Sequence, residues 1–244
     1  MIRTEDYRFY WLFLIGTVLA CRGLGAQSVT VKGHITLEAK RGRPADKSSA
    51  VIWLNPLNRE SRLRNVNDPM TPQHFRLMQR DKKFVPHVLV VPAGAVVDFP
   101  NDDPFFHNVF SLFDGKRFDL GLYEAGSTRA VNFNAPGVSY IFCNIHPEMS
   151  AVVIVTEGPY YAVANPGSDF AIENVPAGRY RLNVWHERCL PETLKSVSRE
   201  VDISASSYSL GEIRLAQTGD LLAKHKNLYG RDYAPPSAGS YDEP

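Results

Sequence analysis

Short apolar runs separated by turn-forming residues are the feature that most constrains the fold of this chain. Runs of this kind occupy 88–91, 95–99 and 151–155, and each is about as long as a single β-strand. Gly, Pro, Asn and Asp interrupt them at short intervals, as in the two Pro-Ala-Gly sequences at 92–94 and 176–178. Many short strands with frequent turn signals are typical of β-sandwiches and barrels. The sequence therefore predicts an all-β fold without a long amphipathic helix.

The overall charge of the chain is close to balanced. Its 244 residues include 27 Lys and Arg against 26 Asp and Glu, which gives a formal net charge of +1. Nucleic-acid binders usually carry a basic excess for phosphate contacts, so we expect no nucleic-acid partner. The stretch 57–83 is a local exception, and it fits either a solvated loop or a docking patch for an acidic partner. Its seven basic residues, against three acidic ones, are Arg59, Arg62, Arg64, Arg76, Arg80, Lys82 and Lys83.

The N-terminus has the pattern of an export signal. Two arginines precede the uncharged run Phe9–Ala20, which is too short to cross a bilayer comfortably. We therefore predict a signal peptide over residues 1–26. Ala26 is a suitable last residue for it, but an imperfect lipoprotein signal would end before Cys21 and leave that residue lipidated. Either route predicts an exported, periplasmic protein, soluble or lipid-anchored through Cys21.

The expected mature chain keeps two thiols, Cys143 and Cys189. Cys143 begins the sequence Cys-Asn-Ile-His-Pro-Glu-Met, which places a thiol, an imidazole and a thioether within seven residues directly after an apolar run. These soft or borderline ligands suit copper better than magnesium or calcium. An electron-transfer copper site also needs a second histidine, and His107 is the best candidate because it follows another strand-like run. Cys189 is then expected to be a buried thiol.

These residues resemble the cupredoxin family, the plastocyanin-like and amicyanin-like small blue copper proteins. In that family the first ligand lies in a His-Asn pair after a strand and an Asn-rich turn, as His107 and Asn108 do here. The other three ligands come from one loop of the form Cys-x-x-His-x(n)-Met. The loop at 143–149 is a short version of it, with Pro147 after the histidine. The resemblance covers about residues 74–157 and implies a Greek-key cupredoxin sandwich there.

The resemblance also implies a site and a function. The implied ligands of a single type 1 copper ion are His107, Cys143, His146 and Met149. The residues expected to support the ligand loop are Asn108, through a hydrogen bond, and Pro147. Together with Pro147, an apolar rim is expected from Phe105 and Phe106, through which an electron would leave by way of His146. The protein would not be an enzyme but would transfer single electrons between redox partners, such as a c-type cytochrome or a dehydrogenase.

Other interpretations of the same residues fit less well. Structural zinc prefers more thiolates and no thioether. A nucleophilic Cys–His pair needs an orienting third group and an oxyanion hole, which the sequence does not indicate. Binuclear copper centres need two cysteines in the loop and multicopper enzymes need His-x-His pairs, and the sequence has neither. The alternative functions are a copper-binding accessory protein for metal delivery or sequestration without a redox role, and a docking module with an empty site.

A second β unit flanks the copper-binding stretch on both sides. Residues 27–57 and 158–215 resemble the two halves of a carboxypeptidase regulatory-like, transthyretin-like sandwich. The first half has Val-Lys-Gly-His-Ile at 31–35, and the second has Asn-Val-Pro-Ala-Gly-Arg-Tyr at 174–180. We therefore predict a smaller sandwich interrupted by the copper domain. The alternative is that 28–57 adds strands to the cupredoxin sheets.

The remaining chemistry-bearing residues are assigned more simply. The sequence Trp185-His186-Glu187 lies at a strand end, and a separate metal or substrate site there is left open. His87 is expected to have a structural or supporting role. The histidines expected at the surface are His34, His74 and His225. Residues 216–244 are expected to form a disordered tail.

Overall fold

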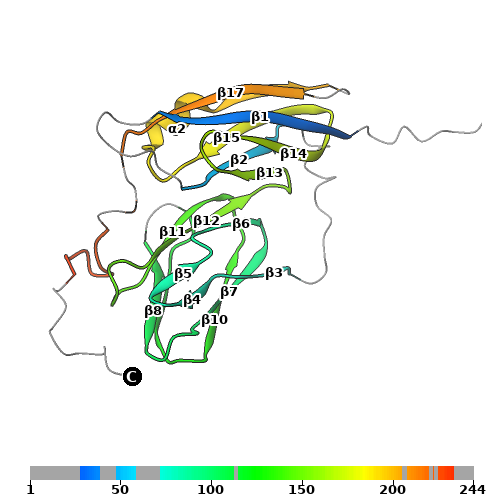
Figure 1. The fold of residues 1–244 in the computed structure, drawn as a ribbon. Coiled ribbons are helices and arrows are strands. Elements are labelled where there is room, and N and C mark those ends of the chain that lie inside the picture. Colours follow the sequence, from blue (N-terminus) through cyan, green and yellow to red (C-terminus); the bar gives the residue numbers. More distant parts are fainter. Residues whose placement is uncertain are drawn as a thin grey trace, which may run out of the picture.

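The computed structural model describes residues 28–38, 48–58, 72–112, 115–204, 208–219, 222 and 225–233. Almost all regular structure in these ranges is β, which confirms the predicted all-β fold, and the helix found among them is the short α2 (Pro191–Val197). The strands form two β-sandwiches that lie one above the other (Figure 1). The part of the chain that the structure describes contains no helix that is long and apolar enough to cross a membrane.

The first sandwich lies between β2 and β13 in the sequence. Its larger sheet has five strands in the order β6-β12-β11-β8-β9, and a three-stranded sheet β10-β7-β3 and a hairpin β4-β5 accompany it. The strand bounds are β3 (His74–Arg76), β4 (Met78–Arg80), β5 (Lys83–Val85), β6 (Val88–Pro92), β7 (Ala95–Pro100), β8 (His107–Ser111), β9 (Phe118–Tyr123), β10 (Thr128–Phe133), β11 (Gly137–Phe142) and β12 (Ser150–Thr156).

The second sandwich is built from both ends of the described chain. A three-stranded sheet has the order β14-β1-β17, and a four-stranded sheet has the order β13-β2-β15-β16. The strand bounds are β1 (Ser28–Glu38), β2 (Ala50–Pro56), β13 (Tyr161–Ala164), β14 (Ser168–Pro176), β15 (Gly178–Trp185), β16 (Arg199–Ile203) and β17 (Tyr208–Ala216). Because β1 pairs with β14 and β17, and β2 pairs with β13 and β15, the sheets join segments on either side of the first sandwich. This is the pairing that the two half-patterns in the sequence indicate.

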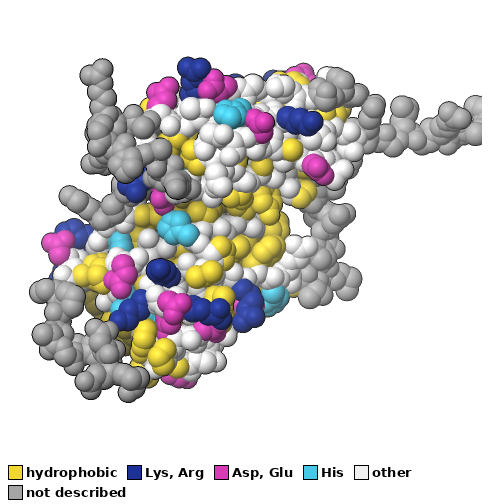
Figure 2. Space-filling view, viewed as in Figure 1, with side chains coloured by type: hydrophobic (Ala, Val, Ile, Leu, Met, Phe, Trp, Pro, Cys, Tyr) yellow, Lys and Arg dark blue, Asp and Glu magenta, His cyan; other side chains and the backbone are white. Residues whose placement is uncertain are grey.

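Two strands are buried on both faces where the sandwiches meet. In β12, Val153 packs into the core of the first sandwich, whereas Val152 and Ile154 face the second. In β2, Ile52 packs into the core of the second sandwich, whereas Val51 faces the first. Two-sided burial explains why both strands are continuous apolar runs instead of alternating ones. Figure 2 shows hydrophobic side chains gathered along the seam between the two sandwiches.

Polar contacts also cross this seam. The indole Nε1 of Trp185 donates a hydrogen bond to the hydroxyl of Tyr140 at 3.3 Å. The imidazole Nε2 of His87, on the first sandwich, lies 2.8 Å from a carboxylate oxygen of Glu187, on the second. Fully burying one aliphatic side chain contributes about 1.5–3 kcal/mol. The apolar seam therefore supplies most of the attraction, and these polar pairs orient the two units.

Two expectations differ from the structure. The stretch 57–83 is not one solvated loop, because its described part contains β3 and β4, and Arg80 pairs with Asp102 at 2.9 Å. The tail is not disordered over 225–233, where the side chain of Asn227 accepts two backbone N–H groups and stabilises a turn. The expected signal peptide at 1–26, with Cys21, and the basic residues Arg59, Arg62 and Arg64 lie outside the described residues.

Candidate metal centre

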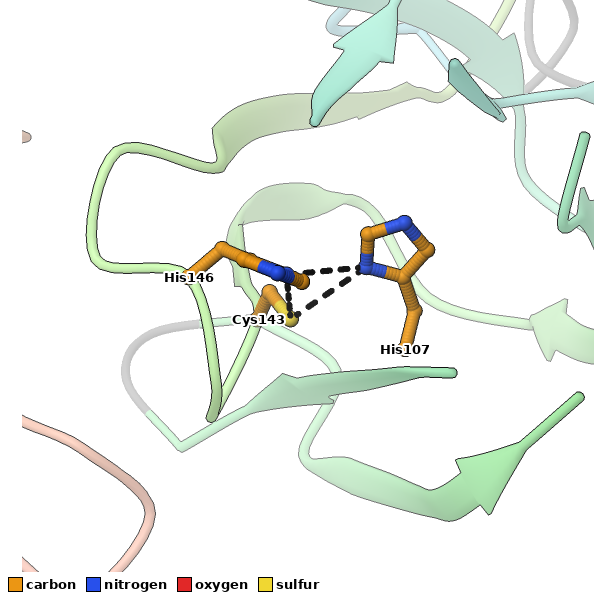
Figure 3. Close-up of side chains that lie close together, drawn as sticks. All are labelled: His107, Cys143 and His146. Atoms are coloured by element: carbon orange, nitrogen blue, oxygen red, sulfur yellow. Dashed lines mark hydrogen bonds between the residues drawn. The ribbon is translucent and has the colours of Figure 1, made fainter. Parts of the chain in front are cut away.

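Three side chains expected as metal ligands converge in the first sandwich. The Nδ1 atoms of His107 and His146 lie 3.1 Å apart, and the sulfur of Cys143 lies 3.7 Å and 3.6 Å from them, respectively. Figure 3 shows both imidazole rings and the thiol pointing toward one another, His107 from the first residue of β8 and the other two from the loop after β11. Donor atoms this close together could be bonded to one ion, since metal–nitrogen and metal–sulfur bonds measure about 2.0–2.3 Å.

The loop that carries Cys143 and His146 is closed by its own backbone. Cys143 follows β11 directly, and its N–H donates to the carbonyl of Met149 at 3.3 Å. The N–H of Met149 in turn donates to the carbonyl of His146 at 3.1 Å. These two bonds fold the seven-residue loop back on itself before β12 begins. Met149 is fully buried in the same hydrophobic cluster as Cys143, but its role as an axial ligand stays a prediction.

The surroundings of Cys143 control its ionisation. Burial raises the pKa of this thiol because the charged thiolate loses its hydration. Backbone N–H groups of Asn108, Ile145 and His146 are directed at the sulfur and oppose that shift. Without a cation, the thiol therefore stays protonated, while three donors already face the position of the thiolate. A metal ion would supply the missing positive charge, because a coordinating thiol is deprotonated outright.

His107 is oriented by a carboxylate that the sequence analysis missed. Its Nε2 lies 2.8 Å from Oδ2 of Asp103, and both side chains are buried. Asp103 also accepts the backbone N–H groups of Asp81 at 2.6 Å and Lys82 at 3.0 Å, in the turn between β4 and β5. A carboxylate beside Nε2 holds the ring proton there and leaves Nδ1 with its lone pair toward Cys143. The only sequence signal was an acid four residues before a histidine.

Both histidines favour the neutral form that a metal ion needs. Burial lowers the pKa of His107, although the hydrogen bond to Asp103 opposes that shift. Burial also lowers the pKa of His146, and the neighbouring His107 lowers it further. The ring of Phe105 lies against both imidazoles, with centroids 5.2 Å from His107 and 5.6 Å from His146. Protons therefore compete weakly for these two nitrogen atoms near neutral pH.

The two supporting residues expected from the sequence behave differently. The side-chain amide of Asn108 donates to Asp119 on β9 at 2.7 Å. The hydrogen bond to the Cys143 loop comes from its backbone N–H, which faces the thiol sulfur. The register explains the side-chain contact, because Asn108 lies on β8, which pairs with β9. Pro147 follows His146 and is exposed.

Three exposed apolar side chains, which we call the apolar rim, lie next to the candidate ligands in the sequence or in strand pairing, and His146 itself is half-buried. Ile145, beside it in the chain, is 43% exposed, and Phe106, beside His107, is 56% exposed. Leu122, whose strand position opposes Asn108, is 62% exposed. Large apolar side chains this exposed next to a candidate site are typical of a docking surface. Phe105 is more enclosed than expected, because it packs against the two imidazoles.

The other candidate residues do not form a second metal site. Within the described ranges, His107, Cys143 and His146 are the one group of three or more such side chains close enough to share an ion. His186 is fully buried, and its Nε2 lies 3.2 Å from the hydroxyl of Ser48. Cys189 is buried as expected, and its thiol donates to the carbonyl of Ala216 at 3.4 Å.

Comparison with known proteins finds copper proteins among similar structures. No family model and no curated protein sequence matches this chain. The copper-containing nitrite reductase NirK from Thermus scotoductus SA-01 is similar over 36% of this chain and 23% of its own, with 25% identity and a TM-score of 0.33. A purple cupredoxin from Nitrosopumilus maritimus is similar over 34% and 99%, with 24% identity and a TM-score of 0.30. Amicyanin from Paracoccus versutus is similar over 36% and 85%, with 25% identity and a TM-score of 0.31.

These likenesses each cover about a third of the chain, so the site itself has to carry a functional argument. The resemblance of the second sandwich to carboxypeptidase regulatory-like modules stays a prediction. One thiol and two imidazole Nδ1 atoms in a largely buried pocket fit copper or zinc and do not fit magnesium or calcium. The donor set is thus compatible with the copper ion that the sequence pattern predicts.

Proposed function

We propose that this protein is an electron carrier with one type 1 copper ion held by His107, Cys143 and His146, and by Met149 as a weak axial ligand. The observation that carries the proposal is the convergence of two Nδ1 atoms and one sulfur within 3.7 Å. Two histidines and one cysteine with a distant methionine are the donor set of blue-copper electron-transfer sites. When bound there, copper supplies a one-electron couple between Cu(I) and Cu(II).

The protein side of the site supports electron transfer over catalysis. The backbone fixes Cys143 through the closed loop, and Asp103 fixes the ring of His107, so the donors need little movement when the charge at the site changes. Cys143 and His107 are fully buried, which keeps water and substrates away from them. His146 reaches the apolar rim and is the donor best placed for contact with a partner.

The partner is proposed to be a one-electron redox protein with an apolar docking face. The exposed Ile145, Phe106 and Leu122 of the apolar rim support such a face, because removing them from water stabilises a complex. Its identity, such as a c-type cytochrome or a dehydrogenase, stays a proposal. Export to the periplasm also stays a proposal, supported by the charged and apolar pattern before residue 27.

The docking face can be tested with the protein alone. Electron self-exchange between reduced and oxidised copper protein is measured by NMR line broadening in the wild type, Ile145→Lys and Val163→Lys. Val163 is a matched control, because it is 50% exposed on β13 of the second sandwich. We expect Ile145→Lys to slow self-exchange at least tenfold and Val163→Lys to leave it unchanged. Equal rates in all three proteins would contradict this docking face.

The redox role itself is tested by repeated reduction and reoxidation of the copper-loaded protein. One equivalent of copper should be reduced by ascorbate and reoxidised repeatedly without leaving the protein. Release of the metal on reduction would favour the alternative of copper delivery or sequestration. Retention of zinc with no stable copper complex would overturn the proposal.

A further inference from the structure

The metal-binding loop makes contact with a segment far away in the sequence. Residues 225–233, which we call the strap, follow the second sandwich and lie beside the loop after β11 (Figure 1). The imidazole of His225 stacks on the ring of Phe142, with centroids 4.0 Å apart and an interplanar angle of 19°. The backbone N–H of Leu228 donates to the side-chain oxygen of Asn144 at 2.8 Å.

The third contact reaches Cys143 itself. The hydroxyl of Tyr233 donates to the carbonyl of Cys143 at 2.8 Å. The N–H of Cys143 already bonds to Met149 inside the loop. Both backbone polar groups of Cys143 are therefore used, one by the loop and one by the strap.

The strap has a defined shape of its own. The side chain of Asn227 accepts the backbone N–H groups of Tyr229 and Arg231, both at 3.0 Å. The N–H of Asn227 donates to the carbonyl of Arg231 at 2.9 Å, and the ring of Tyr233 packs edge-on against His225. Because its own hydrogen bonds close this turn, a displacement of Tyr233 also displaces the rest of the turn.

The strap also contacts the apolar cluster between the two sandwiches, which includes Trp185 and Phe142. Leu228 packs against this cluster, and Leu222, three residues before the strap, is 7% exposed within it. The contacts to Phe142, Cys143 and Asn144 involve three consecutive residues, the last of β11 and the first two of the metal-binding loop. The second sandwich is therefore connected to this loop both through the seam and through the strap.

We infer that the strap positions the metal-binding loop, with Tyr233 and His225 as positioning residues that hold Cys143 and its neighbours in the geometry that binds metal. The inference rests on the proposed function only in taking 143–149 as the metal-binding loop. It gives the second sandwich a role in the site, because the chain must pass through that sandwich to bring Tyr233 to Cys143. The strap bonds to the backbone carbonyl of Cys143 and contacts the side chains of Phe142 and Asn144, and none of these three contacts is to a converging donor atom.

The test compares two tyrosines of the strap in the full-length protein. Tyr233→Phe removes only the hydroxyl that bonds to Cys143, whereas Tyr229→Phe removes a hydroxyl from a side chain that is 74% exposed. Hydrogen exchange of the metal-free protein is followed in peptides covering 143–149. We expect Tyr233→Phe to accelerate exchange there about threefold to tenfold, the factor that one net hydrogen bond supplies. Tyr229→Phe should leave exchange unchanged.

The same variants are then loaded with copper alone, and metal release to a chelator is timed. We expect faster release from Tyr233→Phe than from Tyr229→Phe, whereas a purely structural role would lower the unfolding midpoint without changing the rate of release. His225→Phe, which keeps an aromatic ring on Phe142, should resemble the wild type, and His225→Ala should resemble Tyr233→Phe. Exchange in peptides around Cys189 serves as the control for folding.

Unchanged exchange and release in Tyr233→Phe and His225→Ala would overturn the inference. Faster hydrogen exchange around Cys189 in these variants would also overturn it, since the strap would then stabilise the whole protein and not the loop alone. Failure of the wild type to bind copper would refute the proposed function instead. The exchange result on the metal-free loop would still decide the role of the strap.

Discussion

The Nε2 atom of His107 lies 2.8 Å from a carboxylate oxygen of Asp103, and both residues are buried in the first sandwich. Burial disfavours the charged form of Asp103, but hydrogen bonds from His107, Lys82 and Asp81 outweigh it and lower the pKa of this carboxyl. The carboxylate is thus kept negative beside a candidate ligand. It increases the electron density on His107 and fixes the nitrogen that faces the metal.

We predict that Asp103→Asn weakens copper binding about tenfold to 100-fold, the usual effect of removing a group that orients a ligand. The reduction potential should rise, because the lost negative charge stabilised Cu(II). Asp102→Asn is the matched control, since Asp102 is adjacent, exposed and paired with Arg80 on the surface. Copper competition assays and voltammetry measure both effects. Equal behaviour of the two variants would show that Asp103 does not act through His107.

Met149 provides a prediction about the axial position. An axial thioether donates weakly and stabilises Cu(II), so Met149→Leu should raise the reduction potential by about 60 mV, a tenfold change in relative affinity for a one-electron couple. The protein should stay folded and blue. Met78→Leu on β4, which is half-buried, is the control and should leave the potential unchanged. If Met149→Leu binds copper fully and its reduction potential does not change, Met149 is not a ligand.

The His87–Glu187 pair between the two sandwiches predicts that the stability of the protein depends on pH. The hydrogen bond with Glu187 raises the pKa of His87, as do the charge of Glu187 and the carbonyl of Ser150, whereas burial opposes the shift. A raised histidine pKa means that the stabilisation is complete below the unfolded value of about 6.5 and is lost as the pH rises through the folded value. The imidazole is 43% exposed, so screening limits the contribution to less than about 1 kcal/mol.

We therefore expect His87→Gln to destabilise the protein more at about pH 6 than at about pH 9. The free energy of unfolding of both proteins, measured with urea across this range, gives the difference directly. His74→Gln is the control, because His74 pairs with Asp98 within the first sandwich and is well exposed. A difference between wild type and His87→Gln that is constant with pH would show that the pair contributes no charge-dependent stability.

The sequence predicts the candidate ligand loop from local information, and the structure brings Cys143 and His146 together with His107, while the ligand role of Met149 stays a prediction. Cys143, His146 and Met149 lie within seven residues, and the His107–Asn108 pair follows a recognisable strand and turn. The continuous apolar runs at 50–54 and 151–155 indicate buried strands. They do not reveal that each of these strands separates two cores, because a run that is apolar throughout does not say what lies on either side.

The features that the sequence analysis missed depend on contacts between distant residues. The role of Asp103 is visible only in the folded chain, where the turn at 81–82 donates two backbone N–H groups to its carboxylate. His225 and Tyr233 lie just before a stretch rich in Pro, Ser and Gly, whose composition is typical of disorder. Their order comes from Phe142 and Cys143, more than 80 residues earlier in the chain. Composition alone does not contain that information.

The most direct test of the account is the visible absorption and electron paramagnetic resonance spectrum of the purified protein after addition of one equivalent of Cu(II). The wild type should turn intensely blue through thiolate-to-copper charge transfer, and Cys143→Ser should remove the colour because no thiolate remains at the site. Cys189→Ser should stay blue, because Cys189 is buried in the second sandwich. A colourless wild-type complex, or a blue Cys143→Ser protein, would contradict the assignment of this site.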